Sequence, residues 1–235
     1  MICGFSGSGL VGKIAVDHLI QEFNSEKIGT IYSDLLPPRV YVKDDGSADL
    51  VKHEIYRCTD VYKRDDLLLY TGDFQPVTVE AEFELATKIL DTAIKMGVRM
   101  IYTLAAYITG QFIDKPMVYG TGTDKAILDR ILGYQVKKMP EGSIRGMNGL
   151  LIGMAKIKEI DGMCLLGETS GYIMDAKASQ AVLDSLSRIL RISIDMTKLE
   201  ARAKETEILL QRINDLGPSG RQQPISGDQD LAYIS

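Results

Sequence analysis

A glycine-rich segment near the start of the chain has the residue types that can hold a phosphate group. Residues 7–12 (GSGLVG) match GxGxxG, follow an apolar run and open a helical pattern, and Asp34 lies 22 residues after Gly12. In a dinucleotide site, such glycines let the backbone approach a pyrophosphate, and the acidic residue binds a ribose. Glycines are also needed where a strand bends sharply into a closely packed helix. The segment predicts either a phosphate or nucleotide loop at Gly7, Gly9 and Gly12, or a structural turn.

An acidic turn further along the chain offers a second candidate. Residues 167–171 (GETSG) have the outline of a nucleophile elbow with Thr169 at its centre. An elbow needs a histidine base, and nothing in the sequence marks His18 or His53 as that partner. Glu168 falls where a strand is expected to end, which is where α/β sheets bind ligands. Glu168 and Thr169 are therefore candidate binding residues, and no catalytic residue is predicted.

Metal and cofactor chemistry finds little support in the sequence. Cys3, Cys58 and Cys164 are far apart and form no CxxC pair, and the chain has two histidines. The pattern favours buried cysteines in a reducing compartment, and no metal or cofactor is predicted. Residues 120–124 (GTGTD) lack the lysine of a P-loop, so a turn with a helix cap at Thr123 is the favoured interpretation.

Composition and charge place the chain among ordinary globular proteins. Of its 235 residues, 45% are hydrophobic and 25% are charged, and the net charge is -5. This acidic balance argues against a nucleic-acid partner, which needs a clustered cationic face. No apolar run approaches the roughly 18 residues that span a bilayer, and the first residues do not resemble a signal peptide. We expect a soluble, cytoplasmic protein.

Strand and helix patterns alternate along the chain. Around a turn at 44–47, residues 39–43 and 50–56 read as a β-hairpin. The alternation predicts an α/β fold: a largely parallel sheet with helices on both faces, within one domain over residues 1–215. The other expected strands lie at 2–5, 27–33, 67–70, 98–104, 134–139 and 163–166, and the main helices follow Gly12, Pro76, Thr123, Gly149 and Asp175.

The C-terminal part is expected to be a helix followed by a flexible tail. Thr197 and Glu200 have the spacing of a capping box, which predicts a helix over 197–214. Its apolar residues form a narrow seam that either lies on its own domain or contacts another subunit; the candidates are Leu199, Ala203, Leu210 and Ile213. Residues 216–235 are rich in Gly, Pro, Ser and Gln, a composition typical of a mobile segment.

An ordered series of short motifs resembles the proteasome assembly chaperone family. The resemblance covers roughly residues 2–210, and its most specific stretch is GMCLLGETSGYIMDAKASQAVLDSLSRIL at 162–190. The other matching motifs are GFSGSGLVG at 4–12, the proline pair at 37–38, Gln75-Pro76, YGTGT at 119–123 and GMNGLLIGMA at 146–155.

The resemblance implies a three-layer α/β/α sandwich similar to the nucleoside phosphorylase fold. It also implies a non-catalytic, homo-oligomeric protein that binds proteasome α subunits or the 20S core and assists assembly. The alternative from the residues themselves is an enzyme or sensor that binds a nucleotide or nucleoside through residues 7–12.

Family members often engage the proteasome through a C-terminal hydrophobic-Tyr-X ending, with the tyrosine second from last. Here Tyr233 is third from last, so the terminal carboxylate lies one residue further from the tyrosine than in that ending. The candidate partner-binding residues are Leu231, Ala232, Tyr233, Ile234 and Ser235. An end without a binding role is the competing interpretation.

Overall fold

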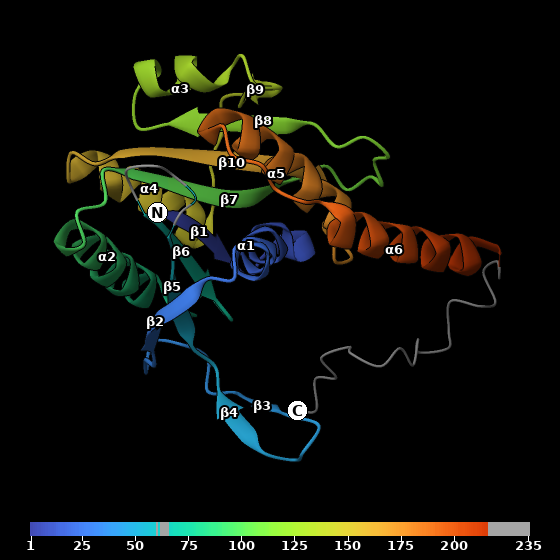
Figure 1. Cartoon of the computed structure of the whole chain (residues 1–235), viewed down its shortest axis with the longest axis horizontal. Helices are drawn as coiled ribbons and strands as arrows, with labels where there is room; N and C mark the ends of the chain where they lie inside the picture. Colours follow the sequence, from blue (N-terminus) through green and yellow to red (C-terminus); the bar gives the residue numbers. More distant parts are fainter. Residues whose placement is uncertain (60, 62–65, 216–235) are drawn as a thin grey trace.

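A computed structural model describes residues 1–59, 61 and 66–215, without the side chains of 207 and 209–215 (Figure 1). In this part of the chain, eight strands form one sheet in the order β2-β5-β6-β1-β7-β10-β8-β9. The strands are β1 (Ile2–Phe5), β2 (Glu26–Ile31), β5 (His53–Cys58), β6 (Leu67–Gly72), β7 (Met100–Ile108), β8 (Val118–Gly122), β9 (Val136–Lys138) and β10 (Asp161–Thr169).

The centre of the sheet is parallel and its flanks are mixed. Strands β6, β1, β7 and β10 run parallel, and β5 and β2 continue the sheet antiparallel on one side. On the other side, β8 pairs antiparallel with β10, and β9 pairs parallel with β8. All six residues of β6 are buried, as expected for a strand covered on both faces. The prediction of a largely parallel sheet is confirmed for this central group.

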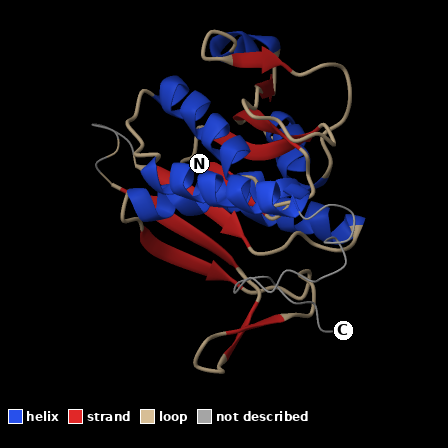
Figure 2. Ribbon diagram, turned by 90° about the vertical axis from the view of Figure 1, so that its right-hand side faces the viewer, coloured by secondary structure: helices blue, strands red, loops and turns tan. Residues whose placement is uncertain are grey.

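Helices cover both faces of the sheet and complete a three-layer sandwich (Figures 1 and 2). The core on one face contains buried residues of α2 (Val79–Lys95) and α4 (Gly146–Ile157). The opposite core contains those of α1 (Val11–Glu22), α3 (Lys125–Ile131) and α5 (Ala176–Leu190). Helix α6 (Thr197–Asp215) packs against α5. The predicted fold class is confirmed.

The hairpin prediction is correct at its turn and wrong in its second arm. Only β3 (Val40–Val42) and β4 (Ala48–Leu50) form the separate two-stranded ribbon. Strand β5 turns back into the main sheet and pairs with both β2 and β6. Its residues His53 and Ile55 are buried on one face of the sheet, and Cys58 is buried on the other. Alternation of polar and apolar residues is the same in a ribbon as beside a core, so the pattern could not separate the two.

The segment expected to be a turn at 120–124 is largely strand β8. A Cβ added at Gly120 would lie 2.6 Å from Val136 and 2.7 Å from Ile131, so this glycine lets α3 and β9 pack closely on the strand. The cap of α3 is Asp124, whose side chain accepts a hydrogen bond from the N–H of Ile127 (2.9 Å), rather than Thr123. The hydroxyl of Thr123 instead accepts from the backbone N–H of Gly162.

Helix α6 begins where the sequence predicts but with a different cap. The carboxylate of Asp195 accepts hydrogen bonds from both the backbone N–H and the hydroxyl of Thr197, so Thr197 acts as a donor here and not as the capping acceptor. Leu199 and Ala203 are buried within this chain. The side chains of Leu210 and Ile213 and the whole predicted tail at 216–235 lie outside the described residues. No helix in the described part is both long enough and apolar enough to cross a bilayer.

Candidate functional site

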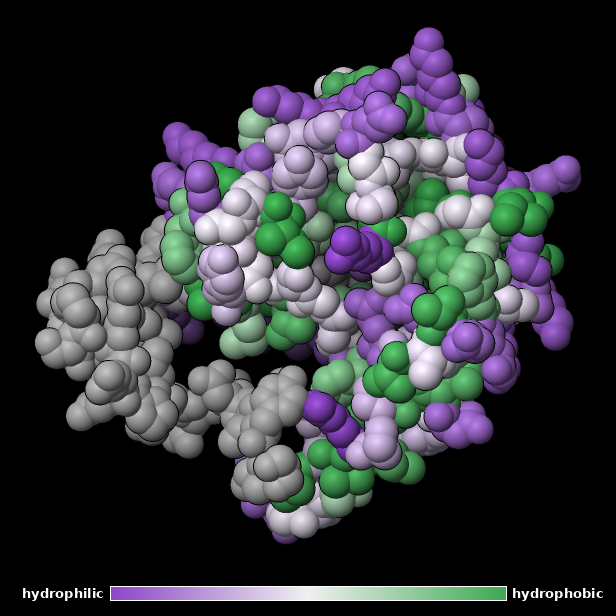
Figure 3. Space-filling view, turned by 180° about the vertical axis from the view of Figure 1, so that it is seen from behind, coloured by the Kyte–Doolittle hydropathy of each residue, from purple (hydrophilic) through white to green (hydrophobic). Residues whose placement is uncertain are grey.

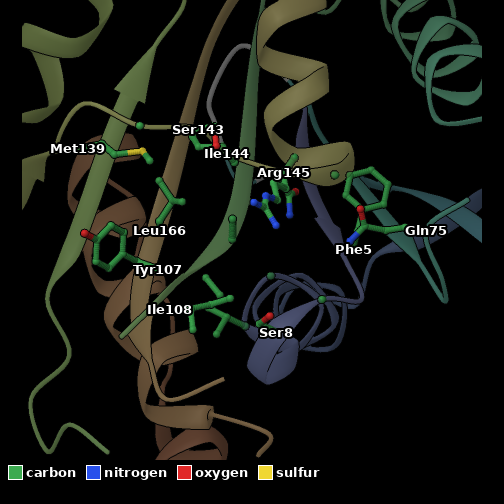
Figure 4. A pocket seen from close by; sticks show the side chains of 18 of the residues that line it. Phe5, Ser8, Gln75, Tyr107, Ile108, Met139, Ser143, Ile144, Arg145 and Leu166 are labelled. Atoms are coloured by element: carbon green, nitrogen blue, oxygen red, sulfur yellow. The ribbon is translucent and has the colours of Figure 1, made fainter. Parts of the chain in front are cut away.

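The chain connections lead to opposite sides of the sheet from the neighbouring strands β1 and β7, and a cavity of about 720 Å³ lies beside this point. Strands β2, β5 and β6 lie on the β1 side, and β8, β9 and β10 lie on the β7 side. The loops that leave two such neighbouring strands diverge, which opens a crevice at the carboxyl ends of the strands where α/β proteins bind ligands. The cavity is lined there by Phe5 of β1, by residues 105–108 of β7 and by Leu166 of β10 (Figure 4).

The predicted glycine loop forms one wall of this cavity, and its glycines have structural duties. A Cβ at Gly12 would lie 2.0 Å from the carbonyl oxygen of Leu104, so this residue allows α1 to cross β7 at close range. Gly9 has φ +63, and a Cβ there would lie 2.9 Å from the hydroxyl of Thr169. Gly7 and Gly12 line the cavity, whereas Gly9 is buried and does not. The structural interpretation therefore applies to Gly9 and Gly12, and Gly7 faces the open space.

Gln75 joins the glycine loop to the start of α4. Its Nε2 donates to the carbonyl oxygen of Ser6 (2.7 Å), and its Oε1 accepts from the backbone N–H of Met147 (2.8 Å). A Cβ at Gly146 would lie 2.3 Å from that same Oε1, so a glycine is needed beside the bridge. One side chain thus connects the segment just after β1 to the first turn of α4.

The opposite wall comes from the segment 139–146 and the first turn of α4. Arg145 is the N-cap residue, but its side chain makes no capping hydrogen bond, and Figure 4 shows it extending into the cavity. Asn148 is 7% exposed and lines the same space. Its side-chain oxygen Oδ1 is buried and has no hydrogen-bond partner among the described residues.

Glu168 and Thr169 lie at the end of β10, as predicted, but they are engaged with the protein itself. The carboxylate of Glu168 accepts from the N–H of Met117 (2.9 Å) and from the hydroxyl of Tyr119 (3.1 Å). Partial burial and this hydrogen bond raise the pKa of Tyr119. Thr169 is buried and donates its hydroxyl to Asp175 (2.7 Å). Neither residue lines the cavity.

The histidines and the distant aspartate do not join this site. His53 is buried, with Nδ1 bonded to the hydroxyl of Tyr70 (2.8 Å) and Nε2 to the carbonyl of Phe74 (2.7 Å), and burial lowers its pKa. His18 is hydrogen-bonded to the carbonyl of Asp195. Asp34 follows β2, the edge strand, which is separated from β1 by β5 and β6. The dinucleotide fingerprint is therefore wrong, because its acidic residue must follow a strand beside β1.

The cysteines behave as the sequence predicts. Cys3, Cys58 and Cys164 are buried and free. Burial raises the pKa of Cys3 and of Cys164 to about 12, so both are protonated thiols near neutral pH. Across the described residues, no three His, Cys, Asp or Glu side chains are grouped so as to hold a metal ion.

Sequence reasoning found the glycine wall of the cavity and missed the opposite one. Gln75, Arg145 and Asn148 were not predicted, although Gln75-Pro76 and residues 146–149 belong to motifs that carried the family resemblance. Gln75 and Met147 are 72 positions apart. The signal that could have singled out Arg145 and Asn148 is an arginine at a helix start followed by a polar residue on the apolar side of that helix.

Comparisons with known proteins agree on one family and one fold. The PAC2 family model matches residues 1–214. An uncharacterized protein of Methanocaldococcus jannaschii is 31% identical over all of this chain and 91% of its own length. The crystal structure of Pyrococcus furiosus PbaB, described as an archaeal proteasome activator, is 36% identical, with a TM-score of 0.84 over 91% of this chain and 92% of that one. P. furiosus PbaA, described as an archaeal homolog of proteasome-assembly chaperone, is 26% identical, with a TM-score of 0.77 over 94% of this chain and 89% of that one.

Proposed function

This chain belongs to the PAC2 family, and from that membership we propose that it is a non-catalytic, homo-oligomeric cytoplasmic protein that binds proteasome α subunits or the 20S core. The observation that carries the proposal is the similarity to PbaB, which extends over nearly the full length of both chains. The similarity to PbaA supports the same class of partner. The role is a chaperone-like one, in which binding energy promotes assembly or activation of another protein.

The exposed ribbon supports a role in binding proteins. Val40 pairs with Leu50 and Val42 with Ala48, so these four side chains share one face of the ribbon. Val42 is 71% exposed, and Val40 and Leu50 are also exposed. Figures 1 and 2 show the ribbon standing away from the main sheet, and Figure 3 shows hydrophobic side chains at this end of the molecule. A grouped apolar face that no described residue covers is typical of an interaction site.

The other face of the ribbon is anchored to the body. Tyr41 stacks on Phe74, with ring centroids 6.1 Å apart, and the guanidinium of Arg39 lies 5.3 Å from the Phe74 ring centroid. The backbone N–H of Lys52, just after the ribbon, donates to the carboxylate of Asp73. These contacts hold the ribbon in one orientation, which reduces the conformational entropy that is lost when a partner binds.

The predicted tail and helix contacts stay part of the proposal. Residues 231–235 lie outside the described part of the chain, and their docking into a proteasome pocket is proposed from the family resemblance alone. Leu199 packs inside its own chain, so the outer half of α6, with Leu210 and Ile213, is the segment we propose for contact between subunits.

The test is binding to purified archaeal 20S particles and to free α subunits, measured by co-elution and by hydrolysis of a fluorogenic peptide. The full chain should co-elute with one of the two, and a chain that ends at Asp230 should bind at least tenfold more weakly. A chain that ends at Ile234 places Tyr233 second from last and should bind more tightly than one that ends at Ser235. Failure of the full chain to bind either partner would remove the proposal.

The ribbon is tested with matched pairs of exposed valines. Replacing Val40 and Val42 by serine should weaken binding to the proteasome or reduce the mass of the oligomer in solution. The control replaces Val77 and Val79 by serine, since these side chains are exposed to a similar degree near the start of α2. Equal effects of the two pairs would show that the ribbon has no special part in binding.

A further inference from the structure

We propose that the cavity between the glycine loop and the start of α4 binds a small organic phosphate monoester. This function is separate from contact with the proteasome through the ribbon, since the ribbon does not line the cavity. Three features of the described residues support it: a buried side-chain oxygen without a hydrogen-bond partner, an arginine without an ion pair, and two helices whose N-cap residues make no side-chain cap.

Asn148 is the residue that points to a ligand. Buried side-chain oxygens in proteins are nearly always hydrogen-bonded, and leaving one unpaired destabilises the fold. The Oδ1 of Asn148 is buried without a partner among the described residues, on a side chain that lines the cavity. A leucine at this position would pack in the helix without that cost. The amide is explained if a ligand in the cavity supplies the missing hydrogen bond.

Arg145 gives the site its charge selectivity. It forms no ion pair with any described residue, and its guanidinium extends into the cavity (Figure 4). The other charged residue of the lining, Glu141, is exposed on the same loop. An arginine presents a planar set of donors that matches phosphate and carboxylate oxygens.

Two helix N-termini add further donors at the cavity. The side chains of Thr78, Asp124 and Asp175 cap α2, α3 and α5, whereas the N-cap residues of α1 and α4 make no side-chain cap and neither helix has an acidic residue in its first turn. At α4, the N–H of Met147 is bonded to Gln75. Residues at or just before the starts of α1 and α4 line the cavity. The N-terminus of a helix carries a partial positive charge, which favours an anion.

Donors from three directions favour a phosphate over a carboxylate, because a phosphate monoester has three peripheral oxygens and a carboxylate has two. The cavity of about 720 Å³ is far larger than a phosphate ion. The remaining wall is mainly apolar and includes Phe5, Ile108, Met139 and Leu166. These residues would contact the organic part of the ester, and Asn148 would bond to a polar atom on it.

The experiment measures thermal shifts and calorimetric binding on the full chain with inorganic phosphate, glycerol 3-phosphate, AMP, adenosine and citrate. We expect saturable binding of at least one phosphate monoester, weaker binding of inorganic phosphate, and none of adenosine. At a ligand concentration 100 times Kd, the melting temperature should rise by about 5 to 10 °C. No binding of either phosphate ester at 10 mM, or binding of citrate alone, would overturn the proposal.

Variants separate ligand binding from folding. Arg145→Met should weaken phosphate binding about 30-fold, as expected for loss of a charge-assisted contact, without changing the melting temperature of the free protein. Lys156→Met removes the same charge from the far end of α4 and should bind like the unaltered chain. Equal affinities of the two variants would refute the role of Arg145.

Asn148→Leu gives a readout that a purely structural asparagine would not. It should raise the melting temperature of the free protein by about 2 to 4 °C, because it removes the unpaired oxygen, and should abolish the ligand-induced shift. A lower melting temperature with ligand binding retained would show that Asn148 serves the fold and not a ligand.

Discussion

Replacing Gln75 by methionine tests whether one side chain holds the two walls of the cavity together. Methionine has a similar length but neither the donor nor the acceptor of the amide. The change removes the hydrogen bond to the Ser6 carbonyl (2.7 Å) and the one from the Met147 N–H (2.8 Å). Both partners belong to the backbone at the ends of elements that line the cavity, so the loss acts on the junction and not on the sheet.

The expected cost follows from these two bonds. Each contributes about 1 kcal/mol net. Because Met147 is fully buried, its N–H would be left without a partner, which brings the total destabilisation to about 2–3 kcal/mol. For a chain of this size, that corresponds to a fall in melting temperature of about 4 to 12 °C.

Urea unfolding followed by circular dichroism measures the change, with Gln111→Met as the control at an exposed glutamine. Gln75→Glu should be intermediate, with a loss of about 1 kcal/mol, because its carboxylate keeps the acceptor at the N-terminus of α4 but cannot donate to Ser6. If Gln75→Met unfolds at the same urea concentration as the unaltered chain, the bridge has no role in stability and the reasoning fails.

Three further predictions concern packing, capping and pH. Gly12→Ala should destabilise the fold by about 3 kcal/mol, since its Cβ would lie 2.0 Å from Leu104, whereas Gly153→Ala, whose Cβ meets nothing within 4 Å, should stabilise α4 by about 0.5–1 kcal/mol. Equal urea midpoints for the two variants would contradict this prediction. Asp175→Ala should cost about 1–2 kcal/mol by uncapping α5, and an unchanged midpoint would show that the cap is dispensable. Burial lowers the pKa of His53 from its ordinary 6.5, so its contribution to the free energy of unfolding is complete above pH 6.5 and declines as the pH falls through the folded-state pKa. Urea unfolding measured between pH 7.5 and 5.5 should show this loss of stability, and His53→Phe should show a smaller one.

The fold was largely predictable because its central strands are apolar on both faces. Residues 67–70 (LLLY) and 163–166 (MCLL) can be buried only between two helical layers, which fixes the class of architecture. The ends of elements were less predictable. Residues 50–56 could equally belong to a ribbon or to the main sheet, and the deciding factor is their pairing with β6, a non-local contact.

Only one wall of the candidate site could be predicted, because the other wall depends on contacts between distant parts of the chain. Gly7 and Gly12 lie in a local motif, so their place at a helix start was visible in the sequence. Asn148 lies on an apolar helix, and only its missing hydrogen bond in the folded chain sets it apart. Glu168 was correctly placed at the end of its strand, but its contacts with Met117 and Tyr119 depend on how the segment before β8 folds back.

The ribbon and the cavity contact two consecutive residues of the chain, and this limits the variants that can affect one proposed function without the other. Phe74 packs under Tyr41 of the ribbon, and Gln75 bridges the two walls of the cavity. A change at either residue can therefore disturb its neighbour through the backbone. Variants at Val42 and Arg145, which lie at the outer ends of the two features, avoid this junction. Loss of proteasome binding in the first and of phosphate binding in the second, each with the other activity intact, would establish two independent sites on one fold.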